Sequence, residues 1–299
     1  DGGCAAASRA ALREVVLEPV PVVEHAWLMT DPETWVGSAP FADIPHGLLP
    51  RLPTLIRHRY TTAINRWTAL PHEGVGLLQR DTDRNPSTSQ LWNELLRPFG
   101  VHDVASLVFV DRFGCWGFLE LWRYGGPFTA GEATALQHAL PTLTTQLRRS
   151  QANTFSLPTR PAPPGGPVVL LLSNDLEVRA QTPQAAEYLR LLVPPTDGAP
   201  AIPAGAYNVA AQLLAVELGV VDHQPQARVH LAEGTWVTLQ AARTEGTDDI
   251  AVSIAPTPPL ARVDVYARCH GLAPREREVL EQLVTGADTR LAARAPDLS

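Results

Sequence analysis

Aromatic and imidazole side chains are the residues of this sequence whose types could bind a small molecule. Six of the seven tryptophans fall before residue 125, accompanied by tyrosine, phenylalanine and histidine. Such side chains can line an apolar pocket and offer it a few polar atoms. They also fill hydrophobic cores, so a ligand pocket and a tryptophan-rich core both remain open interpretations. The candidate ligand-binding residues are Trp27, Tyr60, Trp67, Phe109, Trp116, Phe118, Trp122, His25 and His58.

Catalytic and metal-binding patterns do not occur in the sequence. There is no GxSxG, HExxH, P-loop or GxGxxG motif, and the nine histidines and three cysteines show no metal-ligand spacing. We therefore expect no catalytic residue, no metal and no cofactor. An enzyme whose polar groups meet only in the folded chain remains an alternative.

Charge and hydropathy limit the partners that we expect. The net charge of −7 argues against a broad nucleic-acid-binding surface, so any contact with DNA must be local. No uncharged apolar run is long enough to span a membrane, and the first residues do not have the pattern of a signal peptide. These features predict a cytoplasmic protein without membrane contact.

Two proline-rich stretches divide the chain. Residues 156–167, SLPTRPAPPGGP, have no apolar period and predict a linker, and residues 255–262 predict a second break. The expected units are therefore 1–155, 168–256 and 263–299.

The first unit is expected to mix helices and strands. We predict helices over 5–18, parts of 48–67, 91–100 and 127–151, a strand over 22–31 and a hairpin over 104–123. Thr129 and Glu132 form a capping box at the start of the long helix. That helix carries a leucine stripe that could pack on its own domain or on a second copy of the chain. Strict alternation along the hairpin would put Trp116, Phe118 and Trp122 on one face.

The second unit shows the order strand, strand, helix, helix and then three strands. The strands are expected over 168–173, 176–181, 227–232, 234–243 and 248–255, and the helices over 182–193 and 206–219. This order predicts a single antiparallel sheet with helices on one face.

The third unit contains a short helix with clear start and stop signals. Pro274 fits the first helical position, Glu276 suits the positive end of the helix dipole, and Gly286 ends the helix. An apolar stripe, expected to be buried, is formed by Val279, Leu280, Leu283 and Val284. The stretch from Leu272 to Gly286 resembles the opening of the LuxR-type helix-turn-helix, a four-helix DNA-binding domain. Ala273 departs from the pattern, because the family prefers a threonine cap there.

This resemblance implies a transcription regulator that reads DNA as a homodimer. Phosphate contacts would then come from Arg275, Arg277 and Arg290. Between 269 and 299, however, four arginines face five carboxylates, and only nine residues follow Arg290. The chain as it stands is therefore expected to bind DNA poorly or not at all.

Two further resemblances concern the first two units. The stretches 111–123 and 127–136, followed by the long helix, are similar to a GAF-type sensor domain, and the second unit is similar to a PAS-type sheet. Together they imply an α+β protein with two antiparallel-sheet sensor domains, followed by a partial all-α LuxR-type domain. The implied function is DNA-binding transcription regulation in response to an unidentified small molecule. A sensor or dimerisation module without DNA binding is the main alternative.

Overall fold

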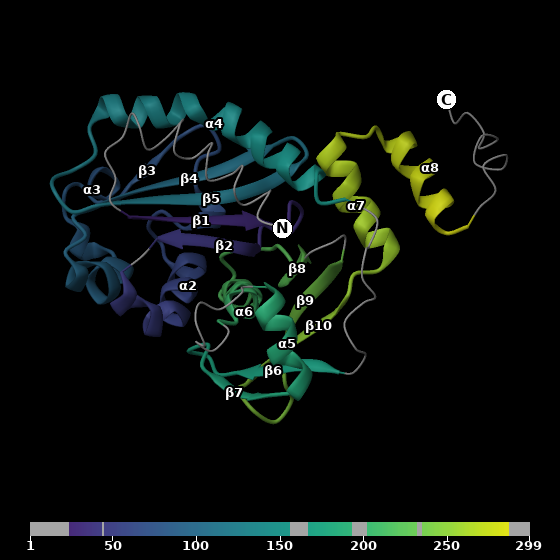
Figure 1. Cartoon of the computed structure of the whole chain (residues 1–299). Helices are drawn as coiled ribbons and strands as arrows, with labels where there is room; N and C mark the ends of the chain where they lie inside the picture. The colour runs from purple at the N-terminus through teal and green to yellow at the C-terminus, as the bar shows by residue number, and fades with distance from the viewer. Residues whose placement is uncertain (1–23, 44, 156–166, 193–201, 232–234, 287–299) are drawn as a thin grey trace.

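The computed structural model describes residues 24–43, 45–155, 167–192, 202–231 and 235–286. They form two five-stranded antiparallel sheets with helices packed on them (Figure 1), which confirms the α+β class. The helix expected over 5–18 and all but the last residue of the expected linker 156–167 lie outside the described residues. No helix in the described ranges is long and apolar enough to cross a membrane.

The first sheet has the strand order β2-β1-β5-β4-β3. Its centre is the predicted hairpin, which the structure confirms, with Asp111 paired to Gly114 across a two-residue turn. The strand expected over 22–31 is β1, and it pairs with both β2 and β5. The strands are β1 (Glu24–Thr30), β2 (Gly37–Asp43), β3 (Gly76–Leu77), β4 (Asp103–Asp111) and β5 (Gly114–Arg123).

A bulge in β5 corrects the predicted placement of three aromatic residues on one face. The register shifts between Phe109 and Val110, so Trp116 is the extra residue of β5. Trp116 therefore packs on the α4 side of the sheet with Phe109, whereas Phe118 lies on the opposite side. Strict alternation failed here because a bulge inserts one residue into one strand only.

Short helices cover one face of the first sheet. The stretch predicted to be partly helical over 48–67 forms η2 (His46–Arg51) and α2 (Leu52–Thr61). The helix predicted over 91–100 is a π-turn, η5 (Trp92–Leu96), followed by η6 (Arg97–Phe99) and closed by Gly100 at φ 78°. Single short turns complete this layer: η3 (Trp67–Ala69), α3 (Leu78–Asp81) and η4 (Pro86–Thr88).

The long helix α4 (Ala130–Ala152) covers the opposite face of this sheet (Figure 1). Its predicted capping box is confirmed, since Thr129 Oγ1 accepts a hydrogen bond from Glu132 N and Glu132 Oε2 accepts one from Thr129 N. The leucine stripe is buried in one core with β4 and β5. The stripe therefore packs on its own sheet. Its members are Leu136, Leu140, Leu143 and Leu147.

The capping box at the start of α4 makes the stability of the folded protein depend on pH in the acid range. The hydrogen-bonded Arg123 guanidinium, helped by Thr129, lowers the pKa of Glu132 from 4.5 to about 2. The folded state thus keeps this carboxylate ionised while the unfolded chain takes up a proton. We expect Glu132→Gln to be destabilising above pH 4.5 and the difference from wild type to shrink as the pH falls toward 2.

Urea unfolding of both proteins across this pH interval measures that difference. Glu245→Gln, at an exposed residue between β9 and β10, is the matched control and should show no such trend. A destabilisation by Glu132→Gln that stays constant from neutral pH to pH 2 would contradict the prediction.

The second sheet has the order β7-β6-β10-β9-β8, in which each strand occupies the same relative position as in the first sheet. Every pairing is antiparallel, as predicted. The helices α5 (Pro183–Leu192) and α6 (Ala204–Glu217) share one core with one face of this sheet. The strands are β6 (Val168–Leu172), β7 (Val178–Gln181), β8 (Gln226–His230), β9 (Trp236–Arg243) and β10 (Ile250–Pro256).

The two sheets are joined by a continuous hydrophobic core. Tyr60 and Phe118 of the first unit belong to the same buried cluster as Tyr207 and Leu239 of the second. The contact is close, because a Cβ at Gly37 on β2 would collide with the side chain of Leu28 and lie 3.0 Å from Asn208 on α6. The two units therefore fold against each other rather than as separate bodies.

Two helices follow the second sheet. The sequence analysis missed α7 (Pro259–His270), which begins in the expected break and packs on the end of α4. Its signals were Pro259 at the first turn and Gly271 in the left-handed conformation after the last turn. The unit boundary expected at 263 therefore falls inside this helix.

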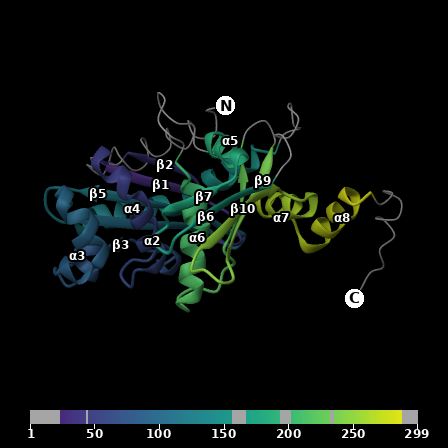
Figure 2. The same ribbon diagram turned by 90° about the horizontal axis from the view of Figure 1, so that it is seen from below.

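The helix predicted to begin at Pro274 and to be ended by Gly286 is confirmed as α8 (Pro274–Val284), and it projects from the body beyond α7 (Figure 2). Glu276 Oε2 accepts a hydrogen bond from Ala273 N at 2.8 Å, which is half of a capping box. The apolar stripe, however, is not buried as predicted: Leu283 and Val284 are 39% and 42% exposed. Val279 and Leu280 are half-buried, and α8 contacts the body mainly through α7.

Candidate functional site

A buried ion pair joins the first sheet to the second. Asp31 follows β1 and Arg228 lies on β8, and both are almost completely buried. Arg228 Nε donates to Asp31 Oδ2, and its Nη2 donates to Asp31 Oδ1, both at 2.7 Å. This bidentate geometry is the strongest arrangement that a guanidinium and a carboxylate can form.

The pair extends into a network that reaches α8. Arg228 Nη1 donates to Asp264 on α7 at 2.7 Å. Asp264 in turn meets Arg268 at 3.0 Å and Arg277 of α8 at 2.6 Å. Glu33 completes the network, because it forms ion pairs with Arg228 at 2.9 Å and with Arg268 at 3.5 Å. We call these residues the interdomain network: Asp31, Glu33, Arg228, Asp264, Arg268 and Arg277.

The pKa values in the network reflect mutual stabilisation of charge. Burial alone would lower the pKa of Arg228, but the hydrogen bonds that it donates to Asp31 and Asp264 raise its pKa above the usual value. Burial likewise would raise the pKa of Asp264, but the Arg228 and Arg268 guanidiniums lower it. Both side chains are therefore ionised at neutral pH. Each can stay buried in its charged form only because its oppositely charged partners are present.

The turn after β1 positions Asp31 for this task. Asp31 Oδ1 accepts the backbone N–H of Glu33 at 3.0 Å, and Asp31 O accepts that of Trp35 at 3.0 Å. The turn holds Trp35 at φ 62°, a left-handed conformation that bulky residues rarely adopt. The same carboxylate thus fixes the turn and receives the guanidinium of Arg228.

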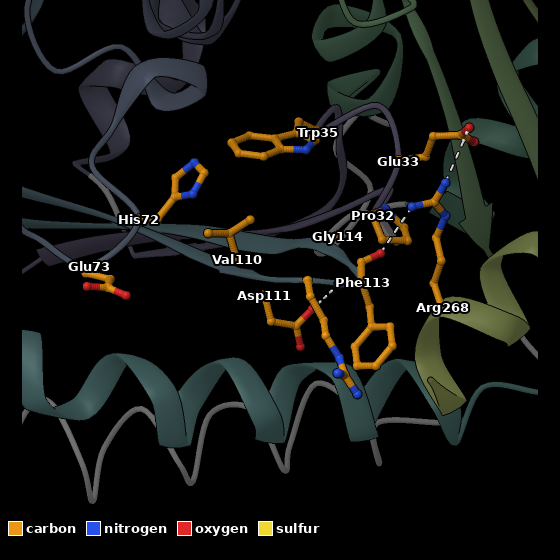
Figure 3. Close-up of a pocket in the computed structure, with 11 residues that line it drawn as sticks. Pro32, Glu33, Trp35, His72, Glu73, Val110, Asp111, Phe113, Gly114 and Arg268 are labelled. Carbon is orange, nitrogen blue, oxygen red and sulfur yellow. Dashed lines mark hydrogen bonds and ion pairs between the residues drawn. The ribbon is translucent and has the colours of Figure 1, made fainter. Parts of the chain in front are cut away.

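A hollow of about 530 Å³ lies beside the network. Three segments far apart in the sequence meet there: the turn after β1, the loop before β3 and the β4–β5 turn, with one side chain from α7 (Figure 3). Gly114 allows this meeting, because a Cβ there would collide with the carbonyl of Pro32. We call it the hairpin hollow, and its lining residues are Pro32, Glu33, Trp35, His72, Glu73, Val110, Asp111, Arg112, Phe113, Gly114 and Arg268.

The structure divides the predicted ligand-binding aromatic residues between the two faces of the first sheet. Trp27, Phe109 and Trp116 are buried on the α4 side, where Trp27 stacks on Phe109 at 5.3 Å. Tyr60, Trp67 and Phe118 are buried on the α2 side, and Trp67 stacks on Phe118 at 5.1 Å. These residues fill cores in this structure, and they do not line the hairpin hollow.

Trp122 joins a third cluster around a buried carboxylate. Glu120 on β5 is fully buried and pairs with the buried Arg59 of α2. Trp67 Nε1 donates to Glu120 Oε1 at 3.0 Å, and Trp122 Nε1 donates to Glu120 Oε2 at 3.3 Å. Glu120 was not singled out from the sequence, where it stands as one charged residue in an apolar strand.

The predicted histidines are both buried and lie apart. His25 lies on β1, on the same face as Trp27. His58 on α2 makes a 3.3 Å hydrogen bond with Glu94, and burial lowers its pKa in spite of that partner. Among the described residues, no three His, Cys, Asp or Glu side chains are grouped so that they could hold a metal ion.

The buried cysteines are not poised as nucleophiles. Burial raises the pKa of Cys115 and of Cys269 to about 12. Both are free thiols and remain protonated at neutral pH.

The predicted DNA-contacting arginines have different environments. Arg275 lies exposed on the first turn of α8, and Arg290 lies outside the described residues. Arg277 is engaged by two carboxylates, Asp264 at 2.6 Å and Glu281 at 2.8 Å. Its charge is therefore neutralised in this arrangement before it could meet a phosphate.

Sequence reasoning missed the network itself. No pattern in the sequence singles out Asp31, Glu33, Arg228 or Asp264 as partners of one another. The partners are separated by 197 and 36 residues. No local spacing rule could therefore have paired them, and a single sequence offers no other signal.

Comparison with known proteins adds little to this geometry. No family model matches the chain, and no curated protein matches it. Among solved structures, the crystal structure of the E. coli DhaR(N)-DhaL complex aligns with 15% identity over 85% of this chain and 86% of that chain, at a TM-score of 0.28. A likeness of that size carries no argument about fold or function.

Proposed function

We propose that this chain is the sensing region and the first DNA-domain helix of a transcription regulator. The first unit is a GAF-like sensor domain and the second a PAS-like domain. The chain acts by binding rather than by catalysis, and α8 opens a LuxR-type helix-turn-helix. The shared strand order of the two sheets supports a common sensor architecture.

The observation that carries this proposal is the attachment of α8. This helix stands away from the body with its apolar stripe partly exposed, as expected for a helix whose domain partners are not packed on it. Its docking contact includes the ion pair from Arg277 to Asp264, which belongs to the interdomain network. A change at the junction of the two sheets therefore reaches α8 directly.

Dimerisation is part of the proposal, and only the resemblance to the LuxR-type family supports it. The leucine stripe of α4, which could have served a second copy, is occupied by the chain's own sheet. A dimer would need another surface.

Selection from a random DNA library tests the proposal, using the protein expressed from its complete natural gene. We expect enrichment of a defined sequence at low salt, with affinity that falls steeply as salt rises. A selected pool that is indistinguishable from the input library would contradict the proposal. It would favour the alternative, a sensor or dimerisation module without DNA binding.

A further inference from the structure

We propose that the hairpin hollow is a binding site for a small amphipathic amine, a protonated amino group on an apolar or aromatic body. The proposal rests on the sensing part of the proposed function and assigns it a place in the fold. The hollow's volume of about 530 Å³ lies within the range of about 300–1,000 Å³ in which small ligands are bound.

One wall of the hollow is aromatic and rigid. Trp35 stacks on His223 of the second unit with ring centroids 5.2 Å apart, and His72 contacts the same indole at 5.5 Å. The turn fixed by Asp31 holds the Trp35 backbone. An indole held in this way can receive a cation or an apolar ring without an ordering cost. Val110 faces it across the hollow (Figure 3).

The charged groups of the hollow favour a cation. Arg268 is already bound to Asp264 and donates to Phe113 O at 3.1 Å. Arg112 lies over the Phe113 ring at 4.6 Å. Both guanidiniums that line the hollow are therefore engaged in other contacts.

The carboxylates of the hollow differ in how fully they are paired. Glu73 has no ion-pair partner among the described residues, and its side chain is at one end of the hollow (Figure 3). Asp111 pairs with Arg148 at 3.3 Å and also accepts hydrogen bonds from Phe113 N at 2.8 Å and Trp116 Nε1 at 3.0 Å. An ammonium group placed beside Glu73 gains charge-assisted hydrogen bonds, whereas an anionic group there would meet like charge.

Binding of a ligand in the hollow would change the docking of α8. Glu33 and Arg268 line the hollow and also belong to the interdomain network. A ligand that fills the hollow contacts these two side chains and so acts on the charges around Asp264, the residue that holds Arg277. The hollow is therefore linked to the docking of α8 through shared residues.

Calorimetric titration of the whole chain with phenethylamine, and separately with 3-phenylpropionate, tests the site. The two probes share an aromatic body and differ in charge. We expect saturable one-to-one binding of the amine and at least about tenfold weaker binding of the acid, which corresponds to about 1.4 kcal/mol. Glu73→Gln should weaken the amine about fivefold, the effect of one partly exposed ion pair.

Glu245→Gln, an exposed carboxylate in the turn between β9 and β10, is the matched control and should leave amine binding unchanged. Trp35→Leu is the second variant. It should weaken the binding of phenethylamine and should not strengthen the binding of 3-phenylpropionate. Equal binding of both probes, binding of neither, or amine binding that is insensitive to Glu73→Gln would overturn the proposal. The titration contains no DNA, so its outcome is independent of the DNA selection described above.

Discussion

Replacement of Arg228 by methionine is expected to lower the free energy of unfolding by about 3–5 kcal/mol. The substitution leaves Asp31 fully buried, with its backbone hydrogen bonds but without the guanidinium that neutralises it. It also removes one of the cations around Asp264. A buried carboxylate that loses its partner retains its desolvation cost and loses the compensating attraction.

Urea unfolding followed by circular dichroism measures this loss. The control is Arg57→Met, which removes the exposed ion pair between Arg57 and Asp175, whose side chains are 30% and 70% exposed. We expect that control to cost about 0–1 kcal/mol. A cost for Arg228→Met that is no larger than the control would show that the network does not hold the two sheets together.

Replacement of Glu120 by leucine is expected to have a comparable effect, about 3–5 kcal/mol. Arg59 would remain in the core with its side chain only 5% exposed and without a carboxylate. The indole N–H groups of Trp67 and Trp122 would lose their acceptor as well. A buried donor left without a partner costs about 1–3 kcal/mol.

A double-mutant cycle separates charge from packing at this position. Arg59→Met combined with Glu120→Leu removes both charges, and we expect it to be about 1–3 kcal/mol more stable than the sum of the single variants predicts. Tryptophan fluorescence reports unfolding directly, because Trp67 and Trp122 contact the altered site. Strictly additive costs would contradict the view that Arg59 and Glu120 depend on each other.

The secondary structure followed from local sequence signals to a large extent. The hairpin, the capping box of α4, the helix α8 and the antiparallel character of the second sheet were all predicted, because caps, turns and alternation act between residues a few positions apart. The failures were local departures from regular spacing. The bulge at Trp116 shifted one residue to the other face, and α7 was hidden in a proline-rich break.

The aromatic residues illustrate what a residue type alone leaves open. Tryptophan and phenylalanine serve a ligand pocket or a core equally well, and the difference depends on what packs against them. The structure places α4 over Trp27 and Trp116, and it places α2 and its neighbours over Trp67 and Phe118. Residues that looked like one group in the sequence are thereby separated by the thickness of a sheet.

The sequence by itself therefore determined many of the elements and the α+β class, because these depend on neighbours along the chain. Only the tertiary structure decided the partners of Asp31, Glu120 and Arg277. A charged residue in a sequence is indistinguishable from a solvated one until the fold removes its water. The hairpin hollow and the path from it to α8 arise from segments that meet only because two sheets share one core.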